Sequence, residues 1–146
     1  MRIVFDTSSL ITALRSSRGA AAEVLRLVLL ERVVILMDYK IASEYRDVAL
    51  RRKHLQASGR TAESVLSLVE GIESIAEPIV VIEKLRPLSP DPNDDMILDV
   101  AINGQADAIV TQNTKHFAIA ARRYGIKVLT PIELLGTIRN GDANGN

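Results

Sequence analysis

Residues 1–14, MRIVFDTSSLITAL, open the chain with a short apolar run that ends abruptly at a carboxylate. Residues 3–5, Ile-Val-Phe, favour a β-strand, and their unbroken apolar character is typical of a strand covered on both faces, as in a parallel sheet. Asp6 and three hydroxyl residues follow directly. An aspartate that ends a buried strand is costly to desolvate unless it is hydrogen-bonded, paired or bound to a cation. The stretch therefore predicts either a helix cap, formed by Asp6 or Ser8, or a functional site at this end of the strand.

Apolar runs alternate with amphipathic segments along the rest of the chain. The expected elements are strands at residues 33–37, 78–82, 108–111 and 127–129 and helices at residues 10–14, 20–31, 39–53, 61–75, 96–103 and 116–124, with a last helix from residue 131. This alternation predicts an α/β fold with a mainly parallel sheet and helices on both of its faces. We expect one domain over residues 1–138 and a disordered polar tail over residues 139–146. In such sheets, ligands bind beyond the carboxyl ends of the strands.

The composition excludes several classes of protein. The chain has 146 residues, of which 47% are hydrophobic, so it is long enough to bury a core within one domain. Eighteen basic residues balance eighteen acidic ones, and no overall positive charge indicates a nucleic-acid or membrane partner. The absence of cysteine excludes disulfides and thiolate chemistry. Because no apolar run approaches the roughly 18 residues that span a bilayer, we expect a cytoplasmic protein.

A second group of acids precedes the helix expected at residues 96–103. Asp91 stands before a proline and is a good helix N-cap, and acids in the first helical turn complement the helix dipole. This structural interpretation does not explain Asp99, which lies one turn beyond Asp95 on the same helix face, where like charges repel. A bound cation relieves that repulsion.

Two further positions complete the polar set. Glu44 lies in the middle of the helix expected at residues 39–53 and borders its apolar face, so it either keeps its carboxylate in solvent or turns it toward a site. Thr111, Gln112 and Asn113 follow the fourth expected strand and share one edge of the sheet with Asp6. The two histidines lack the partners of a zinc site, and the chain has neither a glycine-rich phosphate loop nor a nucleophile elbow.

Three stretches together resemble the PIN-domain family. They are residues 1–14, residues 90–117 (PDPNDDMILDVAINGQADAIVTQNTKHF) and residues 127–135 (KVLTPIELL), and the resemblance is closest to the VapC-like toxins of toxin–antitoxin systems. It implies a three-layer α/β/α fold and a ribonuclease dependent on Mg²⁺ or Mn²⁺, with RNA as substrate, a cognate antitoxin as partner, and a homodimer.

The resemblance also assigns the site residues. Asp6, Glu44 and Asp95 correspond to the acids that hold the metal. The family's fourth acid corresponds to Asn113, which is the main departure from the pattern, because an amide coordinates without bringing charge; Asp94 or Asp99 then compensates.

The remaining positions are expected to support this catalytic set. The residues expected to orient the metal ligands are Thr7, Ser8, Asp99 and Thr111, and those expected to guide RNA are Arg51, Arg52, Lys53 and Lys115. Two alternatives stay open. One is a degenerate, catalytically inactive PIN domain that binds RNA or protein, and the other is a small phosphatase that uses the same metal site.

Overall fold

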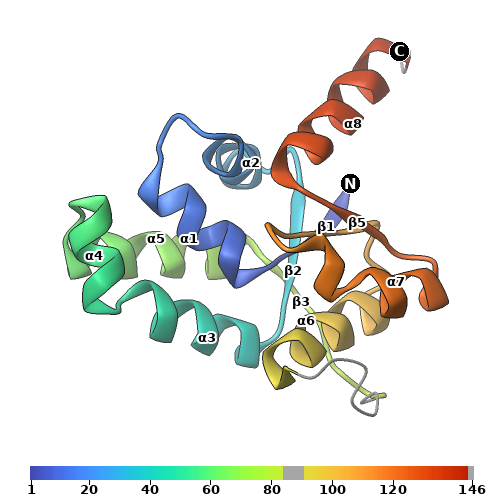
Figure 1. Cartoon of the computed structure of the whole chain (residues 1–146), viewed down its shortest axis with the longest axis horizontal. Helices are drawn as coiled ribbons and strands as arrows, with labels where there is room; N and C mark the ends of the chain where they lie inside the picture. The colour runs from blue at the N-terminus through green and yellow to red at the C-terminus, as the bar shows by residue number, and fades with distance from the viewer. Residues whose placement is uncertain (84–90, 145–146) are drawn as a thin grey trace.

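The computed structural model describes residues 1–83 and 91–144, and within them a five-stranded sheet runs through the centre of the molecule in the order β3-β2-β1-β4-β5 (Figure 1). The strands are β1 (Arg2–Phe5), β2 (Val34–Met37), β3 (Glu77–Pro78), β4 (Ala108–Val110) and β5 (Lys127–Leu129). Each strand pairing is parallel, and β1 pairs with both β2 and β4. The parallel sheet expected from the sequence is confirmed.

Helices cover the sheet on two sides. They are α1 (Thr7–Arg15), α2 (Ala20–Leu29), α3 (Tyr39–Ala49), α4 (Arg52–Ser58), α5 (Ala62–Ile75), α6 (Pro92–Asn103), α7 (Ala118–Tyr124) and α8 (Pro131–Asn144), with a short 3-10 turn, η1, at Thr114–His116. α6 contacts β1, β2 and β4, and α7 contacts β5 and α6. α1, α2, α3 and α5 contact one another on the other side, while α8 packs on α2 and β5 (Figure 1). The arrangement is a three-layer α/β/α fold. None of the helices in the described residues is long and apolar enough to cross a bilayer.

The core is centred on β1 and β4. Ile3, Val4 and Phe5 are buried, and so is the whole of β4. Full burial of consecutive residues requires cover on both faces of the sheet, which explains why these strands are apolar without alternation.

Several elements differ from their expected bounds. α1 begins at Thr7 rather than at residue 10, and α6 begins at Pro92 rather than at residue 96. The helix expected at residues 39–53 ends at Ala49, and α4 begins at Arg52. Residues five apart lie about 140° apart around a straight helix, so an unbroken helix would turn Leu50 and Leu55 to different sides. Both side chains pack against the core, because the helix is interrupted between them. The strand expected at residues 78–82 is limited to Glu77–Pro78, because β2 already ends at Met37 and offers no further partner.

The C-terminal region also differs from expectation. The tail expected to be disordered from residue 139 is helical through Asn144 as the end of α8.

The start of α6 has the cap expected from the sequence. α6 begins at Pro92 with Asp91 as its N-cap, and the Asp91 carboxylate accepts a hydrogen bond from the backbone N–H of Asn93 (3.0 Å). The capping interpretation of Asp91 is confirmed.

Candidate active site

Asp6 lies at the junction of β1 and α1, and its carboxylate is held by two hydroxyl groups. Its Oδ2 accepts hydrogen bonds from Ser8 Oγ (2.9 Å) and Thr111 Oγ1 (2.8 Å). Its side chain makes no capping bond to α1, although Asp6 occupies the N-cap position. The expectation that a side chain of Asp6 or Ser8 caps this helix is therefore wrong for Asp6, and Ser8 lies inside α1 with its hydroxyl directed to Asp6.

Thr111 joins the carboxyl ends of β4 and β1. Its side chain is fully buried, and its Oγ1 both donates to Asp6 and accepts from the backbone N–H of Asn113 (3.0 Å). The backbone N–H of Gln112 donates to Ser8 Oγ (3.3 Å). A hydroxyl has one donor and two acceptor positions, so each of these hydroxyls connects two segments. Asn113, an exposed residue that precedes η1, is thereby kept near the Asp6 carboxylate.

Glu44 is a half-buried residue of α3 whose pKa is affected by other acids. Burial raises the pKa of Glu44 above its ordinary value, and the charge of Asp47 raises it further. Asp91 and Asp6 also raise this pKa, whereas the guanidinium of Arg51 lowers it. Glu44 is thus in the electrostatic neighbourhood of Asp6 at the end of β1 and of Asp91 at the start of α6.

Tyr45, the next residue of α3, connects this helix to β1. Its side chain is completely buried, and its hydroxyl donates a hydrogen bond to the backbone carbonyl of Phe5. Burial raises the pKa of the phenol well above its ordinary value, so it remains a neutral donor. Because Phe5 precedes Asp6 and Tyr45 follows Glu44, this bond ties together the two backbone segments that carry these acids. The sequence indicated Tyr45 only as an apolar residue, so this contact was missed.

We expect Tyr45→Phe to lower the free energy of unfolding by about 1 kcal/mol, because the Phe5 carbonyl loses a buried donor while the packing volume is kept. Urea unfolding followed by circular dichroism measures this change. Tyr39→Phe, at an exposed position at the start of α3, is the matched control and should leave stability unchanged. Equal midpoints for the two variants would contradict the assignment.

The acids of α6 lie beside this neighbourhood. Asp94 is buried, with its Oδ2 3.5 Å from Nδ1 of His116. Asp95 and Asp99 are half-buried, and Asp99 lines a cavity of about 400 Å³ together with Met96 and the segment after β3. Nothing in the sequence around His116 indicates its position beside Asp94.

The acids suit a hard cation by their chemistry, because carboxylate and amide oxygens are what Mg²⁺ and Mn²⁺ prefer. Burial is the main cause of the raised pKa of Glu44, and the charges of Asp47, Asp91 and Asp6 add to it. Within residues 1–83 and 91–144, however, no three Asp, Glu or His side chains are grouped closely enough to hold a metal ion. Binding of one ion by Asp6, Glu44 and Asp95 thus requires their side chains to move together.

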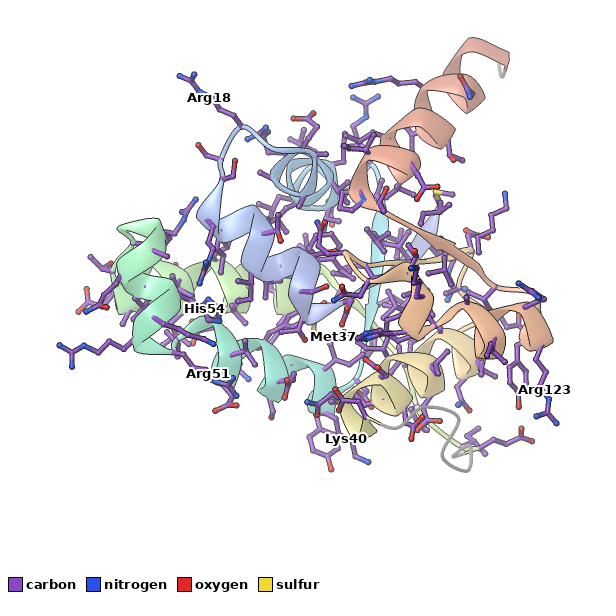
Figure 2. The ribbon with its side chains drawn as sticks, viewed as in Figure 1. Arg18, Met37, Lys40, Arg51, His54 and Arg123 are labelled. Carbon is purple, nitrogen blue, oxygen red and sulfur yellow. The ribbon has the colours of Figure 1, made fainter. Side chains whose placement is uncertain are left out.

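The basic residues expected to guide RNA are exposed. Arg51 forms an ion pair with Asp47 (3.0 Å), and Arg52 and Lys53 begin α4. Figure 2 shows Arg51 just beyond the C-terminal end of α3. Lys40 and Met37, the last residue of β2, lie toward the other end of this helix. Lys115 is exposed in η1. Thr7, the first residue of α1, makes no hydrogen bond to the Asp6 carboxylate among the described contacts.

Comparisons with known proteins agree with this fold. The sequence profile of the PIN domain matches residues 2–115. No curated protein matches the chain. Among solved structures, the chain is similar to one in the crystal structure of VapBC2 from Rickettsia felis bound to a DNA fragment from their promoter, with a TM-score of 0.58 and 22% identity over 88% of this chain and 97% of that chain. The profile match extends over most of the sequence, from β1 to η1, and we conclude that the chain belongs to the PIN domain family.

Proposed function

We propose that this PIN-domain protein is a metal-dependent endoribonuclease that hydrolyses RNA phosphodiester bonds at the carboxyl edge of its sheet. The observation that supports this most strongly is the arrangement of Asp6. Its carboxylate is fixed at a strand end by two hydroxyls, and its charge contributes to the raised pKa of Glu44 on a different element. Acids that act on one another in this way are costly to keep charged without a counter-ion, and they suit a divalent cation.

In this mechanism Asp6, Glu44 and Asp95 would hold Mg²⁺ or Mn²⁺, and Asn113 would offer a neutral carbonyl oxygen. When bound, the ion supplies Lewis-acid stabilisation of the phosphoryl oxygens and makes water a stronger nucleophile. Ser8 and Thr111 keep the Asp6 carboxylate in one orientation through their hydrogen bonds. Tyr45 keeps α3, and with it Glu44, against the end of β1.

The test of the proposed function is RNA hydrolysis with and without divalent cations. Cleavage of an unstructured RNA should require Mg²⁺ or Mn²⁺, stop in EDTA and return when excess Mn²⁺ is added back. A comparison with a phosphate monoester excludes the phosphatase alternative if only the diester is cleaved. Undiminished RNA cleavage in EDTA would refute the proposal.

We also propose that Arg51, Arg52 and Lys53 guide the RNA backbone, together with Lys115. Replacing the first three residues by alanine should weaken RNA binding. It should also reduce the steepness of the dependence of the log of the RNA association constant on log salt concentration by about 2, because each lost phosphate contact with a single strand removes ~0.7. Fluorescence polarisation measures the affinity and the slope. All proteins in this experiment carry Asp6→Asn, so that the RNA is not cleaved during the measurement.

A matched control removes three positive charges elsewhere. Arg18, Arg32 and Arg139 are exposed residues that lie near α2 and α8. Their combined replacement by alanine should leave the RNA salt slope unchanged. If both triple variants reduce the slope equally, RNA contacts are not localised at α4.

A second candidate function is a degenerate PIN domain that binds RNA or protein without cutting it. The neutral Asn113 and the separation of the acids favour it. We expect the wild-type protein to be active already and Asn113→Asp to tighten Mn²⁺ binding several-fold, because the added charge strengthens a hard-cation site. Gln112→Glu adds the same charge one residue away and is the control. An inactive wild type that gains cleavage only through Asn113→Asp would establish degeneration instead.

The proposed biological role is that of a toxin in a toxin–antitoxin system, acting in the cytoplasm as a homodimer with a cognate antitoxin partner. The support is the family, and the similarity of the fold to a chain of the VapBC2 complex. Induced expression should arrest bacterial growth, and the Asp6→Asn variant should relieve the arrest.

A further inference from the structure

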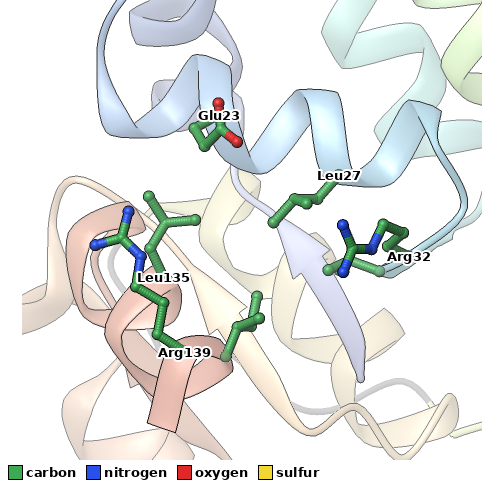
Figure 3. A pocket seen from close by; sticks show the side chains of 7 residues that line it. Glu23, Leu27, Arg32, Leu135 and Arg139 are labelled. Atoms are coloured by element: carbon green, nitrogen blue, oxygen red, sulfur yellow. The ribbon is translucent and has the colours of Figure 1, made fainter. Parts of the chain in front are cut away.

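A groove between α2 and α8 lies outside the proposed nuclease site. It has a volume of about 390 Å³ and adjoins a second hollow of about 380 Å³, with which it shares Glu23, Leu135 and Arg139. Figure 3 shows Leu27 of α2 and Leu135 of α8 on the two sides of the groove, with Arg32 and Arg139 toward opposite ends of it. The two hollows therefore lie side by side at the helix pair.

The floor of the groove is aliphatic. It is formed by Leu27, Val33, Leu135 and Ile138. An exposed apolar side chain extends this surface on α8, since Ile132 lines the second hollow and is 73% exposed. Apolar residues that stay exposed around a hollow are typical of a protein-binding surface.

The rim of the groove is basic. Arg18, Arg32 and Arg139 line the two hollows and are exposed, and no ion pair within residues 1–83 and 91–144 involves any of them. The one acid of the lining, Glu23, is paired with Arg26 at 2.9 Å. The chain as a whole has no net charge, so this surplus of positive charge is a local property of the groove.

The groove is also remote from the acids. Arg32 and Val33 precede β2 and so lie at the amino ends of the strands, whereas Asp6 and Thr111 lie at the carboxyl ends. Figure 1 shows α2 where β2 begins, and α3 and α6 where β2 ends. In addition, α8 lies beyond the residues that the PIN profile matches, so half of the groove is formed by an element outside that match.

We propose that the α2–α8 groove binds an acidic amphipathic segment of a partner protein. Its apolar side chains pack on Leu27 and Leu135, and its carboxylates meet the three rim arginines. Complementary charge around an apolar centre is the ordinary composition of a protein interface. A nucleic acid is a poorer occupant, because the lining contains no aromatic side chain on which bases stack.

The proposal is independent of nuclease activity, because the groove and the acidic site share no residue. A partner bound here leaves the carboxyl edge of the sheet uncovered. Peptide binding should therefore be the same in the Asp6→Asn variant as in the wild type, and failure of the nuclease proposal would leave this result unchanged.

The experiment uses a fluorescein-labelled helical peptide with leucines on one face and glutamates on the other. A scrambled peptide of the same composition and a version with lysine in place of glutamate are the comparison probes. The full-length chain should bind the first peptide more tightly than either comparison, and Arg32→Glu with Arg139→Glu should weaken that binding about tenfold or more. Arg51→Glu with Arg52→Glu makes the same change in net charge at α4 and should not weaken it.

For single-stranded RNA we expect the reverse result. Arg51→Glu with Arg52→Glu, the α4 variant, should lose RNA affinity, whereas Arg32→Glu with Arg139→Glu, the groove variant, should keep it. The proposal is overturned by equal binding of all three peptides, by an unchanged affinity in the groove variant, or by loss of RNA rather than peptide from that variant. It is also overturned if light scattering shows that the groove variant converts a dimer into monomers, because a second copy of the chain then occupies the groove.

Discussion

Asp6→Asn should reduce RNA cleavage more than about a hundredfold, since removing residues that merely orient metal ligands already costs roughly 10–100-fold. The substitution keeps the shape of the side chain and an oxygen that accepts hydrogen bonds from Ser8 and Thr111, but removes the negative charge. The fold should therefore survive, and circular dichroism and thermal unfolding should match the wild type. Initial rates of cleavage of a labelled RNA in Mn²⁺ measure the effect.

Asp107→Asn is the matched control for this variant. Asp107 is an exposed residue whose carboxylate accepts a hydrogen bond from the backbone N–H of Arg2 (2.7 Å), at the amino end of the same strand that Asp6 follows. It undergoes the same chemical change and should retain full activity. An Asp6→Asn protein that cleaves RNA as fast as the Asp107→Asn protein would exclude Asp6 from the reaction.

Thr111→Val should reduce cleavage by roughly 10–100-fold, with a parallel loss of Mn²⁺ affinity. The substitution replaces a fully buried hydroxyl by a methyl group of similar size. The Asp6 carboxylate then loses one of its two hydroxyl donors, and the backbone N–H of Asn113 loses its acceptor. The Asp6 side chain is free to turn away from the site.

Thr111→Ser separates this effect from simple packing. Serine keeps the hydroxyl and removes only the methyl group, so it should restore most of the activity and the Mn²⁺ affinity. If the serine variant is as impaired as the valine variant, buried volume rather than hydrogen bonding to Asp6 controls the site.

The sheet and most helices follow from local sequence, because apolar runs bounded by polar residues, glycine or proline determine where strands and helices begin and end. The exceptions depend on distant segments. β3 is short because its neighbour β2 ends at Met37, and the chain beyond it is held by the side chain of Asn103, which accepts from the backbone N–H of Ile82 (3.0 Å). Neither fact is visible in the residues of the strand itself.

The site is predictable to a similar degree. The position of Asp6 at a strand end, and of Thr111 at the next strand over, follows from the order of apolar and polar residues and from the geometry of parallel sheets. The contact between Tyr45 and the Phe5 carbonyl joins residues 40 positions apart. It is not predictable from the sequence, because a tyrosine on the apolar face of a helix has the same pattern as any other core residue. The sequence predicts Asp91 as a cap, which it is, but its charge also acts on Glu44 of α3, a helix that contacts α6.

Mn²⁺ binding monitored by electron paramagnetic resonance determines whether Asp6, Glu44 and Asp95 act on one divalent ion, as we propose. The wild type should bind Mn²⁺ saturably, and Asp6→Asn, Glu44→Gln and Asp95→Asn should each weaken that binding about tenfold or more, while Glu70→Gln at an exposed position of α5 should not. Equal Mn²⁺ affinity in the wild type and all three site variants would rule out an ion shared by these acids.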